Sequence, residues 1–90
     1  MKITFKNKVV FVTGSSSGIG LSIAKKFVDL NAITLINGRN ENKLIKAKRK
    51  INATHYFCGD VSDKKISNRI VNNIIKVDNK IKLIATDFFE

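Results

Sequence analysis

An apolar run that turns through glycines into a helical pattern constrains this chain more than any other feature. The run Val9–Val12 is followed by Thr13 and then by residues 14–20, which are glycines and serines except for Ile19. Beyond them, Leu21–Leu30 shows the apolar spacing of an amphipathic helix. A strand that passes through a tight turn into a helix N-terminus directs backbone amides and the positive end of the helix dipole toward an anion. The stretch therefore predicts a phosphate-binding loop.

The glycines of this loop stand in the spacing Gly-x-x-x-Gly-x-Gly, with three serines between the first two. In dinucleotide sites one glycine permits the turn, one lets the backbone approach the pyrophosphate, and one lets helix and strand pack closely. The alternative is a loop whose glycines only solve a backbone problem. The strand before it and the helix after it favour the binding interpretation. The candidate binding residues here are Gly14, Ser15, Ser16, Ser17, Gly18, Ile19 and Gly20.

Strands and helices are predicted to alternate along the whole chain, which indicates a parallel sheet with right-handed crossovers. The expected strands are Lys8–Thr13, Ile33–Ile36 closed by Asn37–Gly38, Thr54–Cys58 and Ile81–Ala85, and the expected helices are Leu21 to near Asn31, Glu41–Ile51 and Asp63 to about Val77. The residues expected to face inward are Ile19, Ile23, Phe27 and Leu30, then Leu44, Ala47 and Ile51, then Ile66, Ile70 and Ile74. Asn40 is the expected N-cap of the second helix, and Ser62 that of the third.

Length and composition set outer bounds. Ninety residues suffice for one small domain, and an apolar content of 43% is ordinary for a globular chain. No apolar run approaches the roughly 20 residues that cross a bilayer, and the polar first residues lack the apolar core of a signal peptide. The single cysteine, Cys58, has no partner for a disulfide or a metal site, and we expect it to be a buried small hydrophobe. These features predict a cytosolic protein.

The net charge of +10 raises the question of an anionic macromolecular partner. A nucleic-acid binder concentrates arginines and aromatic residues on one face, whereas the lysines here are scattered along the chain. The densest basic run, Lys43–Lys50, is expected to be the solvated face of a helix. We therefore expect neither a nucleic acid nor a membrane as partner.

The glycine loop, with its leading Thr13 and triple serine, closely resembles the cofactor loop of short-chain dehydrogenases/reductases. The resemblance runs from about Lys8 to Ala85. It implies an α/β Rossmann-type parallel sheet in three αβα layers, with strand order 3-2-1-4. That arrangement is the cofactor-binding half of such a domain. Residues 1–90 are accordingly expected to be a partial NAD(P)-binding domain that stops before the catalytic half.

The residues after the second expected strand bear on the choice of cofactor. Enzymes that prefer NAD end this strand with a carboxylate that binds the ribose hydroxyls, whereas this chain has Gly38 followed by Arg39. A guanidinium pairs with the 2′-phosphate of NADP, which a carboxylate would repel. The resemblance implies that Arg39 selects NADP over NAD; the alternative is an exposed loop arginine. NADP-preferring relatives often carry a basic residue just before the middle glycine, where this chain has Ser17.

Asp60 and Val61 follow the third expected strand. In the family, an Asp followed by an aliphatic residue at this point binds the adenine. The carboxylate accepts a hydrogen bond from the exocyclic amine, and a neighbouring backbone amide reaches a ring nitrogen. The alternative is that Asp60, or Ser62, only starts the next helix.

The catalytic residues of the family have no counterpart in these ninety residues. Relatives use a Ser and a Tyr-x-x-x-Lys pair, in which the Tyr is the general acid/base. The only tyrosine, Tyr56, has Asp60 four positions later and lies in an expected strand, as does the single His55. The Asn-Asn-Ala-Gly-like turn of the family is also missing after the fourth strand, where residues 85–90 read Ala-Thr-Asp-Phe-Phe-Glu. No catalytic residue can be named.

We therefore expect an NADP(H)-binding N-terminal fragment of an oxidoreductase similar to this family, catalytically inactive on its own. The alternative is a free-standing nucleotide-binding or interaction module that a partner chain completes. An uncovered fourth strand at the sheet edge would favour self-association or pairing with a complementing chain.

Overall fold

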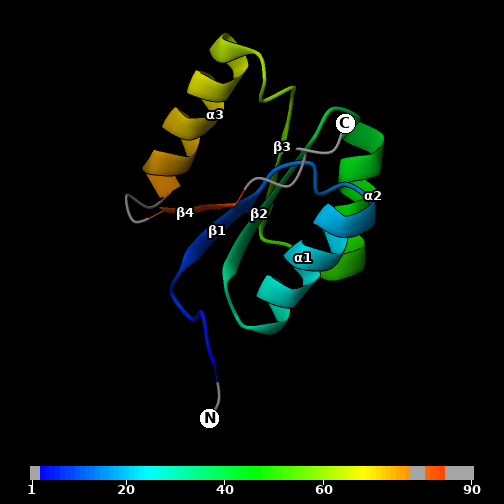
Figure 1. The fold of residues 1–90 in the computed structure, drawn as a ribbon, viewed down its shortest axis with the longest axis vertical. Helices are drawn as coiled ribbons and strands as arrows, with labels where there is room; N and C mark the ends of the chain where they lie inside the picture. The colour runs from blue at the N-terminus through cyan, green and yellow to red at the C-terminus, as the bar shows by residue number, and fades with distance from the viewer. Residues whose placement is uncertain (1–2, 78–80, 85–90) are drawn as a thin grey trace.

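The structure is a parallel sheet with helices on both faces (Figure 1). The computed structural model describes residues 3–77 and 81–84. Its elements are β1 (Val9–Val12), α1 (Gly18–Asp29), β2 (Ile33–Gly38), α2 (Glu41–Ile51), β3 (His55–Cys58), α3 (Lys64–Val77) and β4 (Ile81–Ile84). Every predicted element is present, with small differences at the ends. Ala85, expected to end the fourth strand, lies outside the described residues.

The four strands are parallel and lie in the order β3-β2-β1-β4, which is the expected order. Val9 of β1 is level with Ile33 of β2 on one side and with Ile81 of β4 on the other. Further along β2, Leu35 is level with His55 of β3. Because all strands run the same way, the segments that leave β1, β2 and β3 meet at one edge of the sheet.

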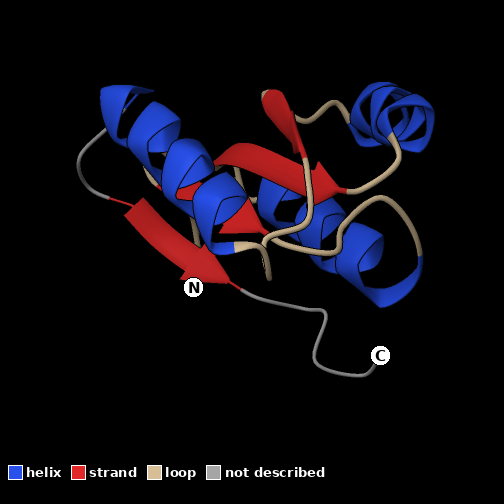
Figure 2. Cartoon of the chain, turned by 90° about the horizontal axis from the view of Figure 1, so that it is seen from above, coloured by secondary structure: helices blue, strands red, loops and turns tan. Residues whose placement is uncertain are grey.

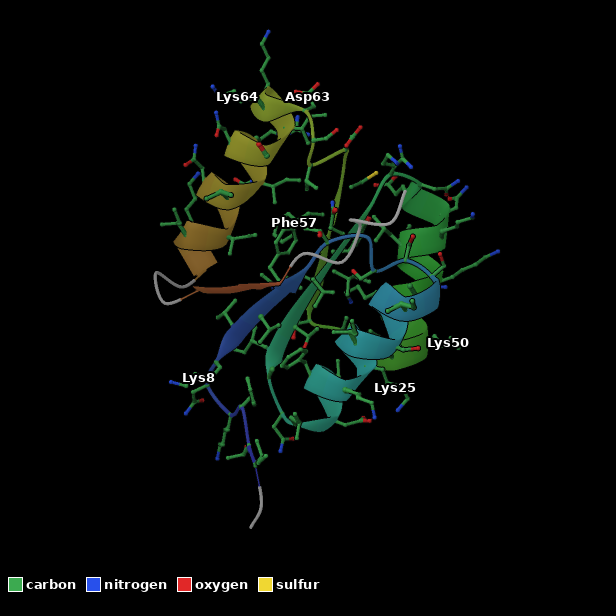
Figure 3. All side chains as sticks on the ribbon, viewed as in Figure 1. Lys8, Lys25, Lys50, Phe57, Asp63 and Lys64 are labelled. Atoms are coloured by element: carbon green, nitrogen blue, oxygen red, sulfur yellow. The ribbon has the colours of Figure 1, made fainter. Side chains whose placement is uncertain are left out.

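Helices α1 and α2 cover one face of the sheet and α3 covers the other, as the view from above shows (Figure 2). Alternate residues of β1 point to opposite faces, so Val10 and Val12 pack toward α1 and α2 while Val9 and Phe11 pack toward α3. Phe57 lies between the sheet and α3 (Figure 3), edge-on to the Phe11 ring at a centroid distance of 6.0 Å. The predicted three-layer arrangement is confirmed.

Helical spacing predicted the inward faces of α2 and α3 correctly. Their buried residues are Leu44, Ala47 and Ile51 of α2 and Ile70 and Ile74 of α3. The prediction for Ile19 is wrong, since this residue is 69% exposed. Ile23 and Phe27 are partly buried against the core, as predicted, and the buried residues of α1 are Gly20 and Ala24. These small residues face the sheet, and Ile19, one position before Gly20, is rotated outward.

The N-cap prediction is confirmed for the second helix and wrong for the third. The Asn40 side chain accepts a hydrogen bond from a first-turn amide of α2 at 3.0 Å. Before α3, one carboxylate oxygen of Asp63 accepts from two first-turn amides, at 2.9 and 3.3 Å. The hydroxyl of Ser62 donates a hydrogen bond to Asp60, and Ser62 is therefore not the N-cap of α3. A carboxylate at the cap also faces the positive end of the helix dipole.

None of the described helices has the length and apolar character that crossing a bilayer requires.

Buried polar side chains join the segments at the carboxyl edge of the sheet. The amide nitrogen Nδ2 of Asn37 donates to the carbonyl oxygens of Phe57 and Gly59, at 2.8 and 3.1 Å. The fully buried hydroxyl of Ser15 donates to the Val12 carbonyl at 2.6 Å and accepts from the Asn37 backbone amide at 2.9 Å. The Ser15 amide in turn donates to the Asn37 carbonyl at 2.8 Å. These bonds tie the ends of β1, β2 and β3 to one another.

Replacing Asn37 with Leu should lower the free energy of unfolding by about 1–3 kcal/mol, because two partly buried carbonyl groups lose their donor. The matched control is Asn42→Leu, at an exposed position of α2, which should change stability by less than about 0.5 kcal/mol. Urea denaturation of the ninety-residue chain, followed by circular dichroism, measures both variants. Equal stability changes in the two variants would contradict a linking role for the Asn37 side chain.

Candidate functional site

A cavity of about 460 Å³ opens at the carboxyl edge of the sheet, within the range of small-molecule sites. Three segments at the carboxyl ends of β1, β2 and β3 line it, and Figure 1 shows that these strands run in the same direction. The lining residues are Gly14, Ser16 and Ser17 after β1, then Asn37, Gly38, Arg39, Asn40 and Lys43, and then Gly59, Asp60, Val61 and Ser62 after β3.

The structure brings most of the predicted binding residues together at this cavity. Those that line it are Gly14, Ser16, Ser17, Arg39, Asp60 and Val61. Gly18 lines a neighbouring hollow of about 400 Å³ between α1 and α2. Ser15 is buried beneath the loop, Gly20 is buried within α1, and the Ile19 side chain points outward, so none of the three lines either space. Direct contact of all ten residues with a nucleotide stays a prediction.

The glycine loop adopts backbone conformations that favour glycine. Gly14 and Gly18 have φ angles of 59° and 60°, in the left-handed region. A Cβ atom at Gly18 would meet nothing within 4 Å, so the backbone angle alone calls for glycine there. Ser17 is the N-cap residue of α1, but its side chain makes no capping hydrogen bond. The Ser17 hydroxyl therefore does not satisfy the first-turn amides, and the positive end of α1 lies beside the loop.

Gly38 lets the glycine loop lie directly against the end of β2. A Cβ atom at this position would stand 2.9 Å from the Ser16 Oγ and 3.1 Å from its Cβ. Any side chain at position 38, including the carboxylate of NAD-preferring relatives, would require Ser16 to shift. The first residue past β2 is Arg39, which lines the cavity.

Asp60 occupies the turn between β3 and α3 and does not cap the helix. Its Oδ1 accepts hydrogen bonds from the hydroxyl and the amide of Ser62, at 2.6 and 2.9 Å. These two bonds lower the pKa of Asp60 below its ordinary value, burial opposes them, and the nearby charge of Arg39 lowers the pKa further. The interpretation of Asp60 as a helix start is therefore wrong. At neutral pH the turn presents an ionised carboxylate to the cavity.

The titratable residues of β3 itself, His55, Tyr56 and Cys58, do not line the cavity. The Tyr56 hydroxyl donates to a Glu41 carboxylate oxygen at 3.4 Å, and its pKa is raised by desolvation and by the charge of Glu41. His55 is exposed. Cys58, expected to be buried, is only partly so, and its thiol lies 3.5 Å from the Arg39 carbonyl oxygen. Among the described residues β3 therefore supplies no acid–base group to this cavity.

Several lining residues were not among the predicted binding residues. They are Asn37, Gly38, Asn40, Lys43, Gly59 and Ser62. Most of them adjoin a predicted residue, so the meeting of strand ends at one edge could have identified them. Lys43 was instead taken as part of a solvated helix face. Its position in the first turn of α2, just after the cap, was the signal for its place at the cavity.

Comparison with known proteins yields one family. The family described as short chain dehydrogenase matches residues 8–86 of this chain. DltE of Bacillus subtilis, described as an uncharacterized oxidoreductase, is 41% identical over 64 residues, which are 71% of this chain and 25% of that protein.

Solved structures have the same fold. A short chain dehydrogenase from Bacillus anthracis is 31% identical, with a TM-score of 0.85 over 92% of this chain and 35% of its own. YwfH, described as an NADPH dependent reductase, is 30% identical, with a TM-score of 0.79 over 84% of this chain and 35% of its own. The chain thus spans between a quarter and about a third of the length of these relatives. With a family match from residue 8 to residue 86 and this shared architecture, the chain belongs to the short-chain dehydrogenase/reductase family.

Proposed function

We propose that these residues are the NADP(H)-binding part of a short-chain oxidoreductase. The single observation that carries the proposal is the placement of Arg39 at the cavity, directly after a glycine whose position lacks room for a side chain. A guanidinium there offers a planar, charge-assisted partner for a 2′-phosphate. The similarity to an NADPH dependent reductase supports the same choice of cofactor.

The three segments around the cavity suit the three parts of such a nucleotide. The glycine loop and the start of α1, residues 14–20, would hold the pyrophosphate. Arg39 would pair with the 2′-phosphate, and Asp60 with Val61 would hold the adenine. Support for this assignment comes from the open backbone at Gly18 and from the ionised carboxylate beside the cavity. A cytosolic location, with a dinucleotide as ligand and neither nucleic acid nor membrane as partner, completes the proposal.

The bound cofactor would supply a hydride, and these ninety residues would hold it without catalysing the transfer. The family's Tyr-x-x-x-Lys pair has no counterpart in the sequence, and Tyr56 hydrogen-bonds to Glu41 away from the cavity. A tyrosine with a raised pKa is also a poorer general base near neutral pH. Binding is therefore the activity proposed for this part of the chain.

Replacing Arg39 with Ala should weaken NADP(H) binding by about 1–3 kcal/mol, because the 2′-phosphate loses a charge-assisted partner. NAD(H) affinity should hardly change. The matched control is Arg49→Ala, which removes an exposed arginine of α2 that does not line the cavity. Calorimetric titration of both cofactors into the three proteins measures the effect. Equal losses for NADP(H) and NAD(H) would show that Arg39 does not distinguish the two cofactors.

The ninety-residue chain should not consume NADPH in the presence of simple aldehydes or ketones, because it lacks the proton donor that carbonyl reduction requires. The absorbance of NADPH reports the reaction, with a full-length member of the family assayed in parallel as the positive control. Steady consumption that depends on the protein and on the carbonyl compound would overturn this expectation.

A second candidate is a module that another polypeptide completes through the edge of β4. Within residues 3–77 and 81–84, β4 pairs with β1 on one side and with no strand on the other. A parallel strand is normally paired on both sides or covered, since its free backbone groups can pair with another chain. This arrangement favours self-association or a complementing chain at the same edge.

The purified ninety-residue chain should therefore form reversible oligomers whose population rises with concentration. Analytical ultracentrifugation measures the oligomers, and amide exchange of β4 should slow as they form, because the edge amides become paired. A sharp monomer at all concentrations, with slow exchange throughout β4, would contradict association at this edge.

A further inference from the structure

The charges around the cavity nearly cancel without Lys43. Among the residues that the structure describes, three charged ones line it, namely Arg39, Lys43 and Asp60. Arg39 and Asp60 line the same cavity with opposite formal charges, and after the two hydrogen bonds from Ser62 the charge of Arg39 is a further cause of the lowered pKa of Asp60. Their formal charges sum to zero, and Lys43 alone makes the cavity positive. A phosphate monoester carries a charge of about −1.5 to −2 near neutral pH. A carboxylate beside the guanidinium lowers its attraction for such a group.

The first turn of α2 holds the backbone of Lys43 at the cavity that Arg39 also lines. The Lys43 amide donates a hydrogen bond to the side chain of the cap residue Asn40 at 3.0 Å. Asn40 directly follows Arg39 in the chain. Lys43 also lines the neighbouring hollow, which it shares with Ser16 and Ser17 of the glycine loop. Its exposed side chain therefore stands where the two spaces meet, and a flexible lysine stem can bring its ammonium group toward either.

From this placement we infer that Lys43 is a second determinant of cofactor specificity, whose ammonium group pairs with the 2′-phosphate beside Arg39. This inference rests on the proposed NADP(H) function. Arg39 supplies the planar, directional contact, and Lys43 supplies a second positive charge, which offsets the negative charge of Asp60. Lys43, the first lysine of the basic run Lys43–Lys50, then recognises the 2′-phosphate.

Two further lysines of α2 distinguish this role from a general positive field. Lys46 and Lys50 lie one and two turns after Lys43 and line the hollow between α1 and α2, but not the cavity. Figure 3 labels Lys50 on this helix. All three side chains are exposed and carry the same charge. Removing either distant lysine changes the net charge as much as removing Lys43 does, without touching the proposed phosphate position.

The test measures NADP⁺ and NAD⁺ binding to the ninety-residue chain by calorimetry, with adenosine 2′,5′-bisphosphate and adenosine 5′-monophosphate as smaller probes. In Lys43→Met, NADP⁺ and the bisphosphate should bind about tenfold more weakly, while NAD⁺ and the monophosphate change by less than about twofold. Lys46→Met and Lys50→Met should leave all four affinities within about twofold. Lys43→Arg should keep the preference for the 2′-phosphate, because it restores the charge. Circular dichroism confirms that each variant is folded.

The outcomes separate this inference from the function on which it rests. A wild-type chain that binds NADP⁺ no better than NAD⁺ contradicts the proposed function itself. If the wild-type preference exists and Arg39→Ala abolishes it while Lys43→Met keeps it, the role of Lys43 is overturned and the proposed function stands. Equal losses in all three lysine variants also overturn the inference, because they would reflect a general field.

Discussion

The cavity depends on the buried hydrogen bonds between Ser15 and Asn37. Parallel strands bring their ends to one edge, but the loops that follow them have no ladder to hold them together. Ser15 exchanges hydrogen bonds with the backbone of Asn37, and the Asn37 side chain continues to the carbonyls of Phe57 and Gly59. Polar groups that are satisfied in this way inside a small protein impose one geometry, because any other arrangement leaves a buried donor or acceptor unpaired. The positions of the residues that line the cavity thus depend on the buried hydrogen bonds of Ser15 and Asn37.

Much of the fold follows from local pattern. The uninterrupted apolar run of β1 and the regular spacing of Leu44, Ala47 and Ile51 predict buried elements, and those elements are present. Alternation of strand and helix then leaves few topologies. Where the pattern failed, as at Ile19, a neighbour was decisive: Gly20 is small enough to face the sheet, and the larger residue turned outward. Spacing shows which residues share a helix face but not how far around the helix the buried line runs.

The site was harder to predict than the fold. Glycine and serine positions in the loop, and Arg39 after β2, are recognisable because their chemistry is local. Asn37 is not recognisable in this way, since its partners follow it by 20 and 22 positions and are identified only once β2 and β3 are aligned. Lys43 was hidden for another reason. A run of lysines on a helix looks uniform in sequence, and only the position of the helix end shows which of them adjoins the cavity.

The sheet divides the interior into two cores. Among the described residues, eight buried side chains form the core under α1 and α2, and five form the core under α3. The glycine loop and Arg39 adjoin α1 and α2, whereas Asp60 and Val61 lead into α3. The two ends of the cavity therefore belong to regions that can open separately. A nucleotide that touches both ends would couple the two regions, so ligand binding would increase the cooperativity of the fold as well as its stability.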